Sequence, residues 1–180
     1  MPSSPSIAAC LVLHDGATPP ALEADVRRLV QVADEVVVYD TGDHLAPGTP
    51  AFEATLHPAV TVVSGFWAED RDRAHQAALA HVASDWTLCL LAGERVEIER
   101  TRLRQVLAEA CDLPALSVRV DDVVRGSHRS PRLLHTSRTP LPPSLQGADV
   151  AEVPSEVLRV SQPVDITAGI PRQRGVFDRV

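Results

Sequence analysis

The chain has 180 residues, of which 44% are hydrophobic and 23% are charged, and its formal net charge is −7. This length supports one domain with a substantial core and is short for two full domains. The acidic balance argues against a nucleic-acid-binding surface, which needs clustered positive charge. No apolar run approaches the roughly 20 residues of a membrane-spanning helix. All 17 basic residues are arginine, which excludes a lysine Schiff base and a P-loop lysine.

Strand and helix patterns alternate along the first two thirds of the chain. Strands are expected where apolar or β-branched residues run together, and helices where apolar residues recur about every 3.6 positions. The expected elements are, in chain order, strand 7–13, a helix beginning at Pro19 and Pro20, strand 36–39, a loop through Pro50, strand 60–63, helix 68–83, strand 86–91, helix 100–110 and strand 116–121. This alternation predicts a mainly parallel α/β sheet with helices on its faces.

The last third of the chain has short candidate strands near 132–135 and 156–160 and no convincing helix. We therefore expect a tail over 1–6, a single domain over 7–160, and a C-terminal tail over 161–180 that is disordered or packs on a partner.

Cysteine usage bears on the cellular compartment. Cys10, Cys89 and Cys111 lie in apolar or helical stretches, far from CxxC spacing. This pattern is typical of buried free thiols in a reducing compartment. The N-terminus has no basic region ahead of its apolar run, unlike a secretory signal. We therefore expect a cytoplasmic protein.

Polar residues follow three of the expected strands, where an open parallel sheet binds ligands. They are residues 14–15 (HD), 40–43 (DTGD) and 91–94 (LAGE). Asp40 can accept a hydrogen bond from a sugar hydroxyl or a base N–H, and the glycine that follows lets a ligand approach the backbone. A solvated turn that caps the next helix would produce the same tetrapeptide, so the motif alone leaves both interpretations open.

The order of these pieces resembles the family-two glycosyltransferases, GT-A fold enzymes that use nucleotide sugars, and points to a bacterial branch. The resemblance extends over residues 7–110 and is carried by segments 7–13 (IAACLVL), 35–42 (EVVVYDTG), 67–70 (WAED), 77–79 (AAL) and 84–88 (SDWTL). It implies a GT-A-like, Rossmann-like sheet flanked by helices, truncated and with a short irregular C-terminal portion.

The resemblance also implies a nucleotide-binding edge. Asp40 matches the acid that binds the uracil or ribose of the donor, and the next two residues match its turn. Residues 69–70 fall on an acidic pair before the next helix, and residues 75–76 (HQ) replace the Arg-Asn pair that faces the phosphates. The implied nucleotide-binding residues are Asp40, Thr41, Gly42, Asp70 and His75.

The family's Asp-x-Asp-Glu motif, whose carboxylates hold the divalent metal and the diphosphate, is matched here by residues 91–94. Leucine and glycine provide no side-chain ligands, and hard cations need several oxygens. Glu94 alone would hold Mn²⁺ or Mg²⁺ weakly, so we expect no cofactor unless this residual site is active. A zinc or manganese site built from His14, Asp43 and His44 is a separate hypothesis that the spacing does not demand.

The catalytic end departs from the family as well. The family places a glycine shortly before a His-Glu pair that supplies a ligand and the base. After residues 146–149 (QGAD) no histidine follows, and the candidate carboxylates are Asp149 and Glu152. Residues 130–134 (SPRLL) resemble the arginine-leucine strand that precedes this element.

These losses favour a catalytically degenerate glycosyltransferase-like module that binds a nucleotide sugar or a partner, because one loss is more easily compensated than three. The alternative is an active, metal-poor glycosyltransferase in which arginines replace the cation; its candidates are Arg71, Arg73 and Arg95. A nucleotidyltransferase-like domain ranks last, since the loop after the first strand contains no basic residue. A shortened sheet would also leave an apolar edge uncovered, which predicts a homodimer.

Overall fold

An eight-stranded mixed sheet carries the fold in the computed structural model, which describes residues 4–14, 19–66, 70–123, 125–138 and 150–162. The elements of this part of the chain are, in order, β1 (Ile7–Leu13), α1 (Pro19–Val32), β2 (Glu35–Asp40), α2 (Pro50–Thr55), β3 (Val60–Ser64), α3 (Arg71–Leu79), β4 (Trp86–Leu91), β5 (Arg95–Ile98), α4 (Arg100–Glu109), β6 (Ala115–Asp122), β7 (Gly126–His135) and β8 (Leu158–Ser161). None of the described helices is long and apolar enough to cross a membrane.

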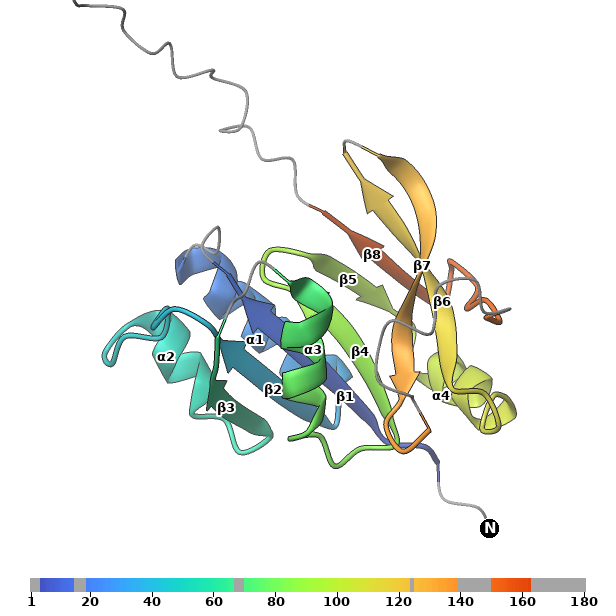
Figure 1. Ribbon diagram of the computed structural model, residues 1–180, viewed down its shortest axis with the longest axis horizontal. Helices are drawn as coiled ribbons and strands as arrows, with labels where there is room; N and C mark the ends of the chain where they lie inside the picture. The colour runs from blue at the N-terminus through green and yellow to red at the C-terminus, as the bar shows by residue number, and fades with distance from the viewer. Residues whose placement is uncertain (1–3, 15–18, 67–69, 124, 139–149, 163–180) are drawn as a thin grey trace, which may run out of the picture.

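The strand order is β3-β2-β1-β4-β7-β6-β8-β5 (Figure 1). Strands β3, β2, β1 and β4 are parallel to one another, β7 is antiparallel to both of its neighbours, and β8 is parallel to β6 and antiparallel to β5. In this register Leu13 lies opposite Asp40, and Val12 lies opposite Leu91. The loops that follow β1, β2 and β4 therefore begin at the same edge of the sheet. The predicted class, a mainly parallel α/β sheet flanked by helices, is confirmed.

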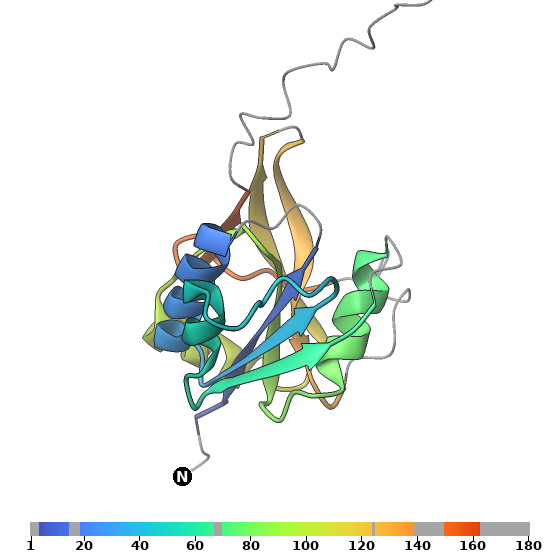
Figure 2. The same cartoon turned by 90° about the vertical axis from the view of Figure 1, so that its left-hand side faces the viewer.

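Helices cover both faces of the sheet (Figure 2). The larger core joins alternate residues of β1, among them Leu11, to Leu22 of α1 and Leu107 of α4. On the opposite face Cys10 packs with Ala74 and other small residues of α3. Successive side chains of a strand point to opposite faces, so the continuously apolar β1 serves both cores.

Strands 7–13 and 86–91 have the predicted bounds, whereas two elements were missed. Helix α2 begins where the sequence favours a loop, because Thr49 accepts a hydrogen bond from Phe52 N at 3.2 Å and Pro50 opens the helix. Strand β5 is a four-residue segment whose partner among the described strands is β8, so its formation depends on a strand about 60 residues further along the chain.

Helix α3 is shorter than the predicted 68–83. The Asp70 side chain caps its first turn by accepting a hydrogen bond from Arg73 N at 3.1 Å. Beyond its end, the Glu35 carboxylate accepts hydrogen bonds from Ala83 N at 3.1 Å and Ser84 N at 3.0 Å, which holds the chain in a turn before β4. A contact from β2 therefore ends the helical segment earlier than its composition favours.

The expected strand near 132–135 is the end of the longer β7, which forms a hairpin with β6. Strand β8 ends at Ser161, and of the expected tail over 161–180 only residues 161–162 lie among those described.

Candidate functional site

The carboxyl edge of the parallel strands brings together the turns after β1, β2 and β4. The hydroxyl of Thr41 donates to the carbonyl oxygen of Leu13 at 2.6 Å, which ties the turn after β2 to the end of β1. Asp40 is 7% exposed at this edge. The predicted nucleotide-binding turn thus has a defined position in the fold, anchored across two strands.

The loop after β2 closes around the Asp40 carboxylate. Its Oδ1 accepts hydrogen bonds from Gly42 N at 3.2 Å and His44 N at 3.1 Å, and lies 2.7 Å from His44 Nδ1. Its Oδ2 accepts from Leu45 N at 3.2 Å. Burial alone would raise the pKa of Asp40, but these donors outweigh it and hold the pKa below its ordinary value. Asp40 is therefore a charged anchor for its own loop.

Asp40 also lines a pocket of about 400 Å³ between the loop, α2 and β3. The pocket combines oxygen-bearing side chains with an apolar wall; its lining includes Asp43, Thr55 and Ser64 on the polar side and Leu45, Pro47, Phe52 and Val62 on the apolar side. Apolar walls with a few polar groups are typical of small-molecule pockets.

Glu94 forms a buried ion pair with Arg132 of β7. Arg132 Nη2 donates to Glu94 Oε1 at 2.8 Å, and Nη1 donates to Oε2 at 3.3 Å. The side chains are 2% exposed for Arg132 and 3% for Glu94. A two-point contact of this kind joins both carboxylate oxygens to one guanidinium. The carboxylate of Glu94, the predicted residual metal ligand, is thus paired with a cation of the protein itself.

Further hydrogen bonds hold this pair in the turn after β4. Glu94 Oε2 accepts from Leu91 N at 2.9 Å, and Arg132 Nη1 donates to the carbonyl oxygen of Cys89 at 3.1 Å. Gly93 has a φ of 88°, a conformation that other residues rarely adopt, and its N–H donates to Asp25 Oδ2 at 2.8 Å. An aspartate introduced at position 93 would therefore have a strained backbone conformation.

The residues at this edge do not fit a divalent metal. Both oxygens of Glu94 already accept from Arg132, and positions 91 and 93 provide no side-chain oxygen. No three His, Cys, Asp or Glu side chains in the described ranges are placed to hold a metal ion. The hypothesis of a zinc or manganese site built from His14, Asp43 and His44 is therefore wrong for the described residues, and the His44 ring contacts Asp40 instead.

The other predicted residues lie in several environments. Asp70 caps α3, and His75 is 5% exposed with Nε2 located 3.1 Å from the carbonyl oxygen of Leu90. Glu152 forms an ion pair with Arg129 at 3.3 Å. The other catalytic candidate, Asp149, lies outside the described residues. A nucleotide contact by Asp70 or His75 stays a prediction.

Arg132 is the residue of this candidate site that sequence reasoning missed. It belongs to the SPRLL segment, whose apolar neighbours give the only signal that its side chain is buried. A buried arginine needs an acidic partner, but 38 residues separate it from Glu94. Their separation along the chain gives no indication that they pair. They come together because β7 lies beside β4 in the sheet.

No family model and no curated protein matches the sequence. Solved structures overlap with part of it. A mannosyltransferase from Pyrobaculum calidifontis, in complex with GDP-Man and Mn²⁺, matches 68% of this chain and 36% of its own at 22% identity and a TM-score of 0.45. Glucosyl-3-phosphoglycerate synthase from Mycobacterium tuberculosis, in complex with Mn²⁺, UDP and glucosyl-3-phosphoglycerate, matches 66% and 43% at 13% identity and a TM-score of 0.42. HddC from Yersinia pseudotuberculosis matches 73% and 74% at 9% identity and a TM-score of 0.45. The chain thus spans less than half the length of the first two.

Proposed function

We propose that this chain is a catalytically degenerate glycosyltransferase-like module, which keeps a GT-A-like sheet and does not transfer sugar. The observation that carries the proposal is the buried Glu94–Arg132 pair. The Arg132 guanidinium already binds Glu94, the acid at the implied cation-binding position. A divalent metal at Glu94 would therefore have to displace a positively charged side chain that is only 2% exposed. Such a displacement leaves that charge buried and unpaired, which is costly.

Sugar transfer from a nucleotide diphosphate needs positive charge beside the departing phosphates. The family obtains it from a metal held by carboxylates. Arg132 does not replace that metal, because its guanidinium is buried and already binds Glu94 and the Cys89 carbonyl oxygen. Arg73 and Arg95 are exposed, and among the described side chains no contact directs either toward Glu94; the third candidate, the side chain of Arg71, lies outside the described side chains. The transfer chemistry therefore lacks its positive charge, although the GT-A-like sheet is present.

Nucleoside binding is the part of the family's function that the geometry supports best. A carboxylate has about four acceptor sites, and Asp40 Oδ2 receives one described hydrogen bond, from Leu45 N. The same residue lines the 400 Å³ pocket beside Phe52 and Ser64. We infer that Asp40 accepts a hydrogen bond from a nucleoside hydroxyl or N–H while the phosphates receive no metal.

Thermal unfolding with UDP, GDP, UDP-glucose and GDP-mannose, each with and without Mn²⁺, tests the proposal. A ligand that binds the folded state raises the unfolding temperature. We expect a nucleotide-dependent rise that Mn²⁺ does not increase, together with no consumption of either sugar donor. Asp40→Asn should reduce the rise.

Glu97 provides a matched control for Glu94, since its carboxylate is 70% exposed on β5. A Mn²⁺-dependent rise that is lost in Glu94→Gln and kept in Glu97→Gln would contradict the proposal. Donor consumption without metal would support the alternative, a metal-poor glycosyltransferase. The homodimer stays a prediction, which light scattering tests by the mass in solution.

A further inference from the structure

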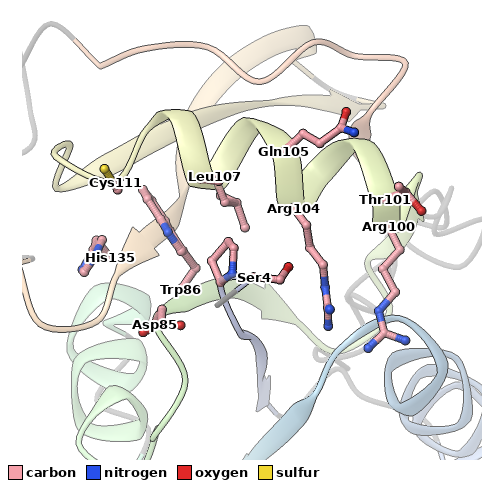
Figure 3. A pocket seen from close by; sticks show the side chains of 12 residues that line it. Ser4, Asp85, Trp86, Arg100, Thr101, Arg104, Gln105, Leu107, Cys111 and His135 are labelled. Atoms are coloured by element: carbon pink, nitrogen blue, oxygen red, sulfur yellow. The ribbon is translucent and has the colours of Figure 1, made fainter. Parts of the chain in front are cut away.

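A second groove lies at the opposite end of the sheet from the Asp40 edge. It has a volume of about 880 Å³ and lies between α4, the segment before β1, the start of β4 and the end of β7 (Figure 3). Asp34 precedes β2 and Trp86 begins β4, so this region is formed by the amino ends of the parallel strands. No part of the proposed function uses it.

One end of the groove carries two arginines that share a single carboxylate oxygen. Arg100 Nη2 lies 2.6 Å from Asp34 Oδ1, and Arg104 Nη2 lies 2.5 Å from the same atom. Asp34 Oδ2 accepts a hydrogen bond from Ile7 N at 3.0 Å. One carboxylate therefore faces two guanidinium groups, which leaves this end with a net positive charge.

Within the described part of the chain, each of the two guanidinium groups donates one hydrogen bond, to Asp34, and has further N–H donors. Their side chains are 44% exposed for Arg100 and 29% exposed for Arg104, and Figure 3 shows both extending from α4 along the groove. Arg104 Nε is buried and has no hydrogen-bond partner among the described residues. A guanidinium presents five N–H donors in a planar fork, which matches the oxygens of a phosphate or carboxylate.

The rest of the groove has both apolar and polar side chains. Pro5 and Ala108 are apolar lining residues that solvent reaches, whereas Leu107 and Trp86 are almost completely buried beneath the surface. The Trp86 ring meets the His135 ring edge-to-face at 5.0 Å between centroids. Asp85 also lies at this end, but its Oδ2 accepts from both Ser6 N and Ser6 Oγ at 2.8 Å. The negative charge of Asp85 is thus engaged at the end away from Arg100 (Figure 3).

We propose that this groove binds a small molecule with an oxyanion head group, a phosphate or a carboxylate, on an apolar body. Arg100 and Arg104 bind the head group, and the body lies along Pro5 and Ala108. The volume falls within the range of small-molecule sites, which are mostly apolar with a few placed polar groups. Asp34 holds the two arginines in position, so little side-chain freedom is lost when the ligand binds.

Calorimetric titration of the full chain with four probes tests the proposal: phenyl phosphate, phenylacetate, inorganic phosphate and benzyl alcohol. We expect phenyl phosphate or phenylacetate to bind, and the tighter of the two identifies the head group. Inorganic phosphate, which lacks the apolar body, and benzyl alcohol, which lacks the charge, should bind at least about tenfold more weakly. The proposal would be overturned if inorganic phosphate or benzyl alcohol bound the protein with the same affinity as the tighter of the other two probes.

Variants on α4 locate the site. Arg104→Gln should weaken the tighter probe by about tenfold or more, and Arg104→Lys by less, because the charge remains. Arg102→Gln is the matched control, since Arg102 is on the same helix and lies 3.7 Å from Glu156 instead. Unfolding temperatures of all variants report on folding, and Arg100→Gln provides a second test if Arg104→Gln does not fold. Unchanged affinity in a folded Arg104→Gln or Arg100→Gln, or no binding of any probe by the unmodified chain, overturns the proposal.

Discussion

The guanidinium of Arg132 contacts both carboxylate oxygens of Glu94, at 2.8 and 3.3 Å, in a position almost closed to solvent. This pair joins β7 to the turn after β4. In the interior, each charge depends on the other, because an isolated buried charge is far less stable than a paired one. The same contact that stabilises the turn therefore makes it unsuitable for a metal.

Removing one partner of this pair should be strongly destabilising. Arg132→Met leaves the Glu94 carboxylate buried without its cation, and we expect a loss of about 3–5 kcal/mol in the free energy of unfolding. The double variant Arg132→Met/Glu94→Gln should lose less, because glutamine is neutral and still accepts from Leu91 N. Urea denaturation measures both. A double variant that is less stable than Arg132→Met would contradict this expectation.

Acid should weaken the loop after β2. Burial raises the pKa of Asp40, but hydrogen bonds from His44, Gly42 and Leu45 lower it by more than burial raises it. The pKa is therefore below its ordinary value of about 3.9. A lowered folded-state pKa gives stability that is present above the unfolded value and is lost as pH falls through the folded value. Asp40→Asn should therefore be less stable by about 1–2 kcal/mol at neutral pH. The difference should shrink as the pH falls below the ordinary aspartate value of about 3.9; an undiminished difference in denaturation curves at strongly acidic pH would contradict this assignment.

Asp25 should show the opposite dependence. Burial raises its pKa, and the hydrogen bond from Gly93 N and the charges of Arg28 and Arg95 offset this only in part. A raised pKa means that the folded state binds protons more readily, so the contribution of Asp25 to stability falls as pH rises through its folded value. Asp25→Asn keeps an acceptor for Gly93 N and removes the buried charge. We expect the variant to gain stability relative to the unmodified chain between about pH 4 and pH 7, measured by urea denaturation at both values; a relative loss would show that the charge stabilises the turn.

Gly65 allows the chain to pass close to Tyr39. A Cβ at position 65 would lie 1.9 Å from Tyr39 Cζ and 2.1 Å from its hydroxyl oxygen. That hydroxyl also accepts a hydrogen bond from Phe66 N at 3.2 Å. Gly65→Ala should therefore displace the ring and cost about 1–3 kcal/mol in the free energy of unfolding.

The double variant Gly65→Ala/Tyr39→Leu tests the cause of that loss. Leucine lacks the ring atoms that the new methyl group meets, so Gly65→Ala should cost less in the Tyr39→Leu background than alone. Thermal unfolding of the four proteins in this cycle measures the coupling. Equal costs in both backgrounds would assign the effect to the backbone rather than to the ring.

The sequence by itself determined the α/β class, the bounds of β1 and β4, and the place of Asp40 at the end of β2. Apolar runs of six or seven residues and the helical period are local properties, and local patterns predict local structure. Helix α2 and strand β5 are too short to leave such a pattern. Helix α3 ends early because Glu35, 48 residues away, binds the Ala83 backbone.

Only the tertiary structure decided what the predicted edge can bind. The sequence identified Glu94 as a residual acid, but its pairing with Arg132 depends on how β7 lies beside β4. The sharing of Asp34 by Arg100 and Arg104 likewise depends on α4 lying beside the turn between α1 and β2. Charge pairing acts over a few ångströms in space and has no period along the chain, so the alternation that predicts strands and helices contains no information about it.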